Sequence, residues 1–328
     1  ASNNVAVGNN ALTNNTTGTY NTAVGTFALQ TATTANDNTA IGYNTLNSNS
    51  SGVANTAVGS IALGLNTSGS RNTAIGAFTL DASTTANDNV AVGWVALTSN
   101  TTGGENVGVG RNVLATNTTG QQNTAIGTYS QDDSTTASYN TSVGYNSLGA
   151  NTTGITQAAI GWGALSSNTT GTENTGLGSN VLQFNTTGSY NTACGRQALY
   201  ANTTANYNTA FGYYALVGNT TGANNTAFGS FALDNNTTAG NNTSVGYSAL
   251  FANSTGDQNV AVGAYALDAN TTAHNNTAVG YAALGANTTG TQNVSVGAGS
   301  LDANTTANNN TGVGYGALSA NTTGVSNT

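Results

Sequence analysis

A repeat of 17 residues runs through this chain without a slip, and it constrains the fold more than any other feature. Each unit opens with a variant of Asn-Thr-Ala-Val-Gly, as at residues 21–25, continues through Ala-Leu and Asn-Thr-Thr, and closes on Gly or Ala plus two variable residues. Nineteen such units fill residues 4–326. An uninterrupted period is typical of stacked repeats, so the sequence predicts a single repeat domain over residues 1–328.

The positions that do not vary between units predict the shape of one coil. Gly holds the fifth position of all nineteen units, which indicates a backbone conformation or close approach that a side chain would block. The fourth position is apolar in every unit, and the ninth is Leu in all but one, which has Gln131. We expect these two positions to form the core, flanked by small residues at the third and eighth. Cys194 takes the fourth position of its unit, so we interpret it as a buried apolar filler.

Strands fit this unit better than helices, because two helices and a turn would have to share 17 residues with an obligatory Gly and an Asn-Thr-Thr cluster. The predicted fold is all-β, a parallel β-solenoid or β-roll of nineteen 17-residue coils, with short strands near positions 2–4 and 7–10. Asn opens eighteen units, and its side chains are expected to hydrogen-bond from coil to coil as a ladder. Trimeric and end-to-end assembly both remain open at this stage.

The twelfth position is Asn in sixteen units and is followed by two Thr or Ser residues, so each is formally an N-glycosylation acceptor. Two interpretations are open, a glycan site and a structural turn, and the second is favoured because units without this Asn keep the pair that follows. The sixteen candidates are Asn15, Asn49, Asn66, Asn100, Asn117, Asn151, Asn168, Asn185, Asn202, Asn219, Asn236, Asn253, Asn270, Asn287, Asn304 and Asn321.

A longer pattern is superposed on the repeat. Seven units have Ala instead of Gly at the fifteenth position, and the unit after each of them has an aromatic residue directly after its invariant Gly. These aromatic residues, which we call the aromatic stripe, are Tyr43, Trp94, Tyr145, Tyr213, Tyr247, Tyr281 and Tyr315. The stripe is expected either to pack diagonally at a corner of the solenoid, to contact another chain, or to stack on sugar rings.

Composition excludes several classes of function. The chain has no Lys, only three Arg, and a net charge of -8, which opposes binding to nucleic acid or anionic lipid. No apolar run is long enough for a membrane-spanning helix, and no basic-then-apolar leader is seen. The first residue is not Met, from which we expect a processed or excerpted chain. His274 is the only histidine and is expected to be solvated. No catalytic residue, cofactor site or metal site is predicted, and a row of five Asp at the tenth position is too sparse for Ca²⁺.

The string Asn-Thr-Ala-Val-Gly-x-x-Ala-Leu resembles the head repeats of trimeric autotransporter adhesins, which form a parallel β-roll in each of three chains. With Asn-Thr-Thr-Gly added, as in residues 276–290, it is similar to repeat arrays of bacterial and phage tail-fibre-like proteins. The resemblance covers all nineteen units. It implies an extracellular or virion-surface location and a homo-oligomer or filament with a cell-surface or glycan partner.

The favoured function is an extracellular fibre or adhesin shaft that self-assembles through stacked β-coils, with uncapped strand edges inviting end-to-end pairing. The alternative is a surface-binding module, which binds glycans through the aromatic stripe or ice through Thr rows at positions 2, 13 and 14. An enzyme is not expected.

Overall fold

The computed structural model describes residues 2–328, and these residues form parallel β-strands and turns without a helix. Contacts divide the chain into two compact units, one ending at Gly163 and one running from Ala164 to Thr328, which are described separately. Each unit is a parallel β-solenoid, as the repeat predicted. The expectation of a single domain remains a prediction.

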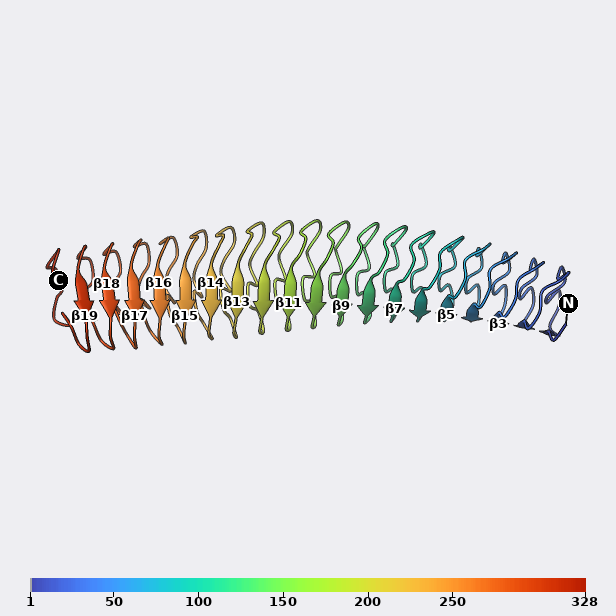
Figure 1. The fold of residues 1–328 in the computed structure, drawn as a ribbon, viewed down its shortest axis with the longest axis horizontal. Coiled ribbons are helices and arrows are strands. Elements are labelled where there is room, and N and C mark those ends of the chain that lie inside the picture. Colours follow the sequence, from blue (N-terminus) through green and yellow to red (C-terminus); the bar gives the residue numbers. More distant parts are fainter. Residues whose placement is uncertain (1) are drawn as a thin grey trace. The chain divides into compact units, whose positions relative to one another are not determined.

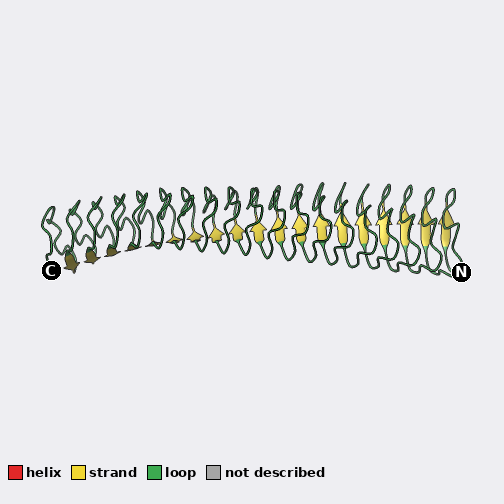
Figure 2. Ribbon diagram, turned by 90° about the horizontal axis from the view of Figure 1, so that it is seen from above, coloured by secondary structure: helices red, strands yellow, loops and turns green. Residues whose placement is uncertain are grey.

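Every coil contributes one strand of three residues (Figures 1 and 2). In the first unit the strands are β1 (Val5–Val7), β2 (Thr22–Val24), β3 (Thr39–Ile41), β4 (Thr56–Val58), β5 (Thr73–Ile75), β6 (Val90–Val92), β7 (Val107–Val109), β8 (Thr124–Ile126), β9 (Thr141–Val143) and β10 (Ala158–Ile160). In the second they are β11 (Thr175–Leu177), β12 (Thr192–Cys194), β13 (Thr209–Phe211), β14 (Thr226–Phe228), β15 (Thr243–Val245), β16 (Val260–Val262), β17 (Thr277–Val279), β18 (Val294–Val296) and β19 (Thr311–Val313).

Strands that follow each other in sequence pair within each unit, always in parallel and with a shift of one repeat. Thr22 is opposite Thr39 and Ala23 opposite Ala40, for example, and Thr192 is opposite Thr209 in the second unit. The strands occupy positions 2–4 of each coil, as expected. The second strand predicted at positions 7–10 is wrong, because this segment forms consecutive turns.

These turns have an unusual backbone that explains why they do not form a strand. The residues at positions 7, 9 and 17 have positive φ in each coil, for example 61° at Phe27 and 49° at Leu29. Their backbone groups still hydrogen-bond to neighbouring coils: the Phe27 N–H donates to Asn9 O at 2.9 Å and the Leu29 N–H donates to Thr45 O at 3.0 Å. A left-handed conformation costs an L-residue about 1–2 kcal/mol. Burial of a Leu side chain contributes about 1.5–3 kcal/mol, which offsets that cost.

The invariant Gly of the fifth position is required on two counts, as the sequence predicted. Gly110 has a φ of 144°, which favours glycine, and a Cβ on this residue would lie 2.7 Å from the backbone of Gly127 in the next coil. Any side chain here would push the coils apart.

The core differs from the prediction at one of its two large positions. The Leu of the ninth position is fully buried in every coil but those of Leu12 and Leu318, as at Leu29 and Leu233, and packs beside the small residues of positions 3 and 8. The apolar residue of the fourth position, in contrast, is not buried in any coil. In β2–β19 the middle residue of the strand points inward, so the first and third residues point outward because strand side chains alternate. Cys194 therefore lies half-buried on the outer face, and its assignment as a buried filler is wrong.

Two ladders of buried Asn side chains complete the interior. In the first ladder, Asn55 donates its backbone N–H to Asn38 Oδ1 at 2.9 Å and its Nδ2 to Gly69 O at 2.9 Å. In the second ladder, at the twelfth position, Asn66 Nδ2 donates to Asn49 Oδ1 at 3.0 Å and to the same Gly69 O at 2.9 Å. Both ladders thus converge on the carbonyl of the fifteenth position. The ladder predicted at the first position is confirmed.

Candidate functional site

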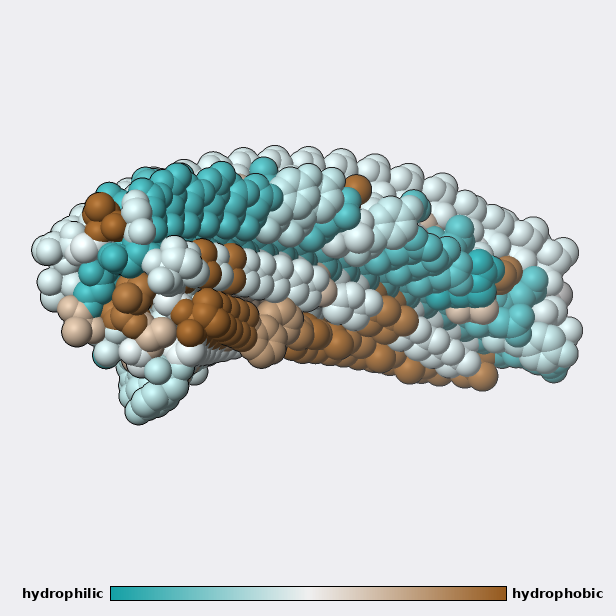
Figure 3. Space-filling view, turned by 60° about the vertical axis from the view of Figure 1, so that its left-hand side comes forward, coloured by the Kyte–Doolittle hydropathy of each residue, from teal (hydrophilic) through white to brown (hydrophobic). Residues whose placement is uncertain are grey.

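Two outward-facing features are candidates for function, and the first is the outer face of the strands. In the first unit the fourth position carries ten β-branched aliphatic residues in successive coils, all of them Val or Ile. We call this set the aliphatic row: Val7, Val24, Ile41, Val58, Ile75, Val92, Val109, Ile126, Val143 and Ile160. Ile41 and Ile126 are exposed at 40% and 41%. Side chains of this kind gather in the brown rows that follow successive coils in Figure 3.

Thr lies beside the aliphatic residue in most coils, at the first residue of the strand, and also points outward. In the second unit it recurs in five successive strands, from Thr175 in β11 to Thr243 in β15. The Thr of the thirteenth position behaves differently. Thr186 Oγ1 donates to Thr203 O at 3.0 Å, and Thr203 Oγ1 donates to Thr220 O at 3.1 Å. Hydroxyls of that row are used to join coils, whereas the Thr of the strands present theirs on the outer face.

The aromatic stripe is the second feature, and its residues are exposed at the turn that follows the strand. In the second unit, five rings from successive coils form an edge-to-face series in which residues at positions 6 and 7 alternate. Tyr213 lies 5.4 Å from Phe231, Phe231 lies 5.9 Å from Tyr247, Tyr247 lies 5.5 Å from Tyr265, and Tyr265 lies 5.9 Å from Tyr281. Edge-to-face pairs at such distances stabilise by about 0.5–1.5 kcal/mol beyond the area they bury.

In the first unit the rings of the stripe form separate pairs of the same kind. Tyr43 packs edge-on against Phe27 and Tyr145 against Tyr129, with ring centres 6.1 and 5.9 Å apart. Trp94 is instead covered by the guanidinium of Arg111, 5.2 Å from its ring centre, and this group also lies 5.7 Å from the ring of Tyr129. Corner packing, one of the expected roles of the stripe, is thus present in both units. The rings nevertheless stay open to solvent: Trp94 is 48% exposed.

Tyr281 is 62% exposed, so its ring is available for contacts beyond the coils themselves.

The acidic neighbours of the stripe come from the tenth position. Burial raises the pKa of Asp132, Asp234 and Asp268, and the adjacent Asp133 raises the pKa of Asp132 further. Backbone N–H groups oppose the rise at Asp268. Among residues 2–328, no group of three or more His, Cys, Asp or Glu side chains is placed to hold a metal ion.

The structure places the sixteen sequon Asn residues in the second ladder, which has a bearing on glycosylation. Fourteen of them are buried, and only Asn15 and Asn321 are half-buried. The acceptor atom is Nδ2, and this atom donates to a carbonyl in the coil, as Asn202 does to Ala205 O at 3.2 Å. A glycan at such an atom would have to displace the interior of the coil.

His274 has a partner that the sequence did not reveal. Its Nδ1 accepts the backbone N–H of Asp257 from the preceding coil at 2.9 Å, and the side chain is 45% exposed. Other residues at this repeat position do the same, since Asn206 Oδ1 accepts the N–H of Ser189 at 2.6 Å. The side chain is thus partly solvated, as expected, and its contact with Asp257 joins two coils.

Comparison of the chain with protein families, with curated proteins and with solved structures finds no match. No helix among the described residues is long and apolar enough to cross a bilayer.

Proposed function

We propose that the chain is a structural shaft of an extracellular fibre or adhesin, in which copies associate side by side through the aliphatic row. One observation carries the proposal: ten Val and Ile side chains in successive coils of the first unit lie on the outer face of the strands, and none of them is buried. Contiguous exposed apolar surface of this kind marks an interaction site in soluble proteins.

The shape of this face suits a second copy of the same chain. The β-branched side chains lie on a parallel sheet whose register does not change from strand to strand. Successive residues of the aliphatic row therefore present a similar apolar surface. Charged residues are absent from the aliphatic row, and a second aliphatic row can therefore cover it without leaving a buried charge unpaired. The resemblance to adhesin heads, which consist of three β-rolls, supports the same interpretation.

The test is the mass of the particle in solution, measured by light scattering during size-exclusion chromatography. We expect a multiple of the chain mass for the unmodified protein. The double variant Ile41→Lys, Ile126→Lys should run as a single chain, because it would bury two unpaired charges. The double variant Ala54→Lys, Thr156→Lys adds the same charge at exposed residues of the seventeenth position and should keep the unmodified mass. A monomeric unmodified protein, or equal masses for both variants, would refute the proposal.

Ice binding is a second candidate, supported by the outward Thr of the strands. The Thr of the thirteenth position contributes less, since its hydroxyl is engaged between coils. Thermal hysteresis in a freezing-point assay, lost on substitution of Thr209 and Thr226 by Tyr, would favour this function over the shaft. No hysteresis is expected if the shaft proposal is right.

A further inference from the structure

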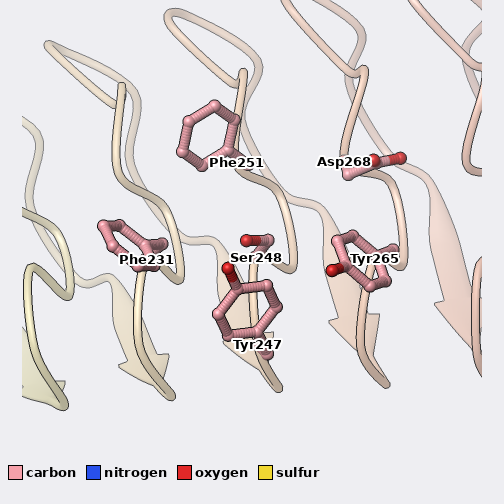
Figure 4. A pocket seen from close by; sticks show the side chains of 6 residues that line it. All are labelled: Phe231, Tyr247, Ser248, Phe251, Tyr265 and Asp268. Atoms are coloured by element: carbon pink, nitrogen blue, oxygen red, sulfur yellow. The ribbon is translucent and has the colours of Figure 1, made fainter.

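Two hollows lie along the aromatic stripe of the second unit. The first has a volume of about 370 Å³ and is lined by Phe231, Tyr247, Ser248, Phe251, Tyr265 and Asp268 (Figure 4). Phe231 and Tyr265 come from coils that are two apart, and both occupy the seventh position. The coil between them has Ser248 at this position. The hollow therefore exists because a small side chain separates two large rings.

The second hollow, of about 360 Å³, lies two coils further on and shares part of this lining, although Gly299 replaces the ring that Tyr265 contributes to the first. Tyr281, Ala282 and Asp302 line it and correspond to Tyr247, Ser248 and Asp268. The corresponding residues are two coils apart, which is a distance of about 9.6 Å for coils joined by parallel strand pairing. The two hollows thus lie two coils apart along the stripe.

The lining combines flat apolar rings with neutral hydrogen-bonding groups. Figure 4 shows the Tyr265 hydroxyl directed back toward the coil of Ser248, while the carboxyl of Asp268 extends toward the following coil. There the Asp268 Oδ1 lies 3.3 Å from the place where a Cβ on Gly285 would be. The carboxyl lies at the edge of the hollow and not at its base, so the site is not a cage centred on a cation. No Lys or Arg lines either hollow, and this opposes an anionic ligand.

Sugar rings match this lining, because they present an apolar C–H face to an aromatic ring and hydroxyl groups around their edge. In an extended β-1,4-linked chain each sugar is turned over relative to the one before, so the same face recurs at every second sugar. The length of that disaccharide is close to the two-coil spacing of the hollows. A polysaccharide lying along the stripe would thus meet the two hollows with successive disaccharides.

We propose that the aromatic stripe of the second unit binds a neutral, extended β-1,4-linked polysaccharide, one disaccharide for each pair of coils. The site is separate from the aliphatic row, since it lies at the turn after the strands and in the other unit. Polysaccharide binding at this site does not depend on side-by-side association of chains, and the two proposals are tested by different measurements.

Isothermal titration of the full chain with cellohexaose and chitohexaose tests the proposal. At least one of these hexasaccharides is expected to bind at least about tenfold more tightly than its disaccharide, because it engages neighbouring hollows together. The double variant Tyr247→Ala, Tyr281→Ala should weaken binding by about tenfold or more. Tyr139→Ala removes an exposed ring from the seventeenth position of the first unit and should leave affinity unchanged.

Ser248→Tyr provides a variant that keeps every ring and fills the first hollow. Tyr occupies the same backbone position at Tyr265, where φ is 60°, so the substitution fits the coil. It should weaken hexasaccharide binding while the unfolding temperature stays near that of the unmodified protein. The proposal is overturned if neither hexasaccharide binds, if the polyanion hyaluronan binds in their place, or if both variants bind as the unmodified chain does. It is also overturned if the double variant changes only the oligomeric mass, since the stripe would then be a contact between chains.

Discussion

Asn191 opens its coil in the second unit, and Asn191→Ala removes one rung of the first buried ladder. Its Oδ1 accepts the backbone N–H of Asn208 at 3.0 Å. Its Nδ2 donates to Ala205 O at 2.8 Å and to Asn174 Oδ1 at 3.1 Å. After the substitution the Asn208 N–H has lost its acceptor inside the solenoid. The Ala205 carbonyl keeps a bond from Asn202 Nδ2, and Asn174 Oδ1 keeps the Asn191 backbone N–H.

These changes set the expected magnitude. A buried N–H without a partner costs about 1–3 kcal/mol, and each of the two lost side-chain bonds costs about 0.5–1.5 kcal/mol. The free energy of unfolding of the second unit should therefore fall by about 2–6 kcal/mol. Thr192→Ala, on the neighbouring outward-facing residue, should change it by no more than about 0.5 kcal/mol.

Asn191→Asp separates hydrogen bonding from the volume of the side chain. A carboxylate still accepts the Asn208 N–H, but it cannot donate to Ala205 O or Asn174 Oδ1 and it places a charge in the interior. Burial and these oxygens would raise the pKa of the new carboxyl. Its folded form then binds a proton more tightly than its unfolded form, so stability should recover as the pH falls through the raised pKa.

Urea unfolding followed by circular dichroism gives the stability change, and hydrogen exchange of the Asn208 amide locates it. Exchange at Asn208 should accelerate in Asn191→Ala and stay slow in Thr192→Ala. A loss below about 1 kcal/mol, or a loss equal to that of the control, would refute the view that the Asn ladder holds successive coils together.

Three further predictions follow from buried polar groups. Gln131 is fully buried; its Nε2 donates to Ser142 Oγ at 2.8 Å, whereas its Oε1 has no partner. Gln131→Leu should therefore raise the free energy of unfolding by about 1–3 kcal/mol. A lower free energy of unfolding, measured with urea, would contradict this prediction. The raised pKa values of Asp132, Asp234 and Asp268 mean that the folded chain binds protons more tightly above the ordinary Asp pKa of 3.8, so the unfolding temperature should rise as the pH falls from 7 toward that value. Substituting all three by Asn should flatten this profile, and a midpoint that falls steadily with acid in the unmodified chain would show that these carboxyls do not control it. The chain secreted from a glycosylating host should have the mass of the bare polypeptide, because the sequon Asn residues are buried in the second ladder. Added hexose and hexosamine mass would contradict this and would show that these Asn residues are modified before the chain folds.

The sequence predicted the features that depend on contact between equivalent residues. The 17-residue period gave the register directly, since Thr22 pairs with Thr39 one repeat later. The Gly of the fifth position and the Asn of the first do not vary for the same reason: each touches its own counterpart in the next coil, as Gly110 does with Gly127. A substitution there disturbs two interfaces at once, which leaves a clear trace in the repeat.

The orientation of the strand was harder to predict, because an apolar residue does not reveal whether it faces the core or another chain. Val58 and Ile75 follow the fourth-position pattern of a core residue, yet they lie on the outer face. The informative signal was the small residue at the third position, which is Ala, Ser or Gly in every 17-residue coil because the interior there is narrow. The turns at positions 7–10 could not be predicted, since Leu is among the residues that rarely adopt positive φ, and Leu29 does so at 49°.

The candidate site was predicted in part. The stripe was recognisable from its longer period, but the first hollow depends on how the small side chain of Ser248 lies between the rings of Phe231 and Tyr265 at the seventh position. That alternation is present in the sequence. Its consequence requires knowing that these side chains lie on one edge in neighbouring coils, which the predicted strand at positions 7–10 obscured.

A map of the intact particle by electron cryomicroscopy tests the central proposal most directly, because it shows what covers the outer face of the strands. We expect a second copy of the chain packed against the aliphatic row, with Ile41 and Ile126 buried between chains and the aromatic stripe of the second unit left open. A particle of one chain, with Ile41 and Ile126 facing solvent, would contradict the proposal that this protein is a self-associating shaft.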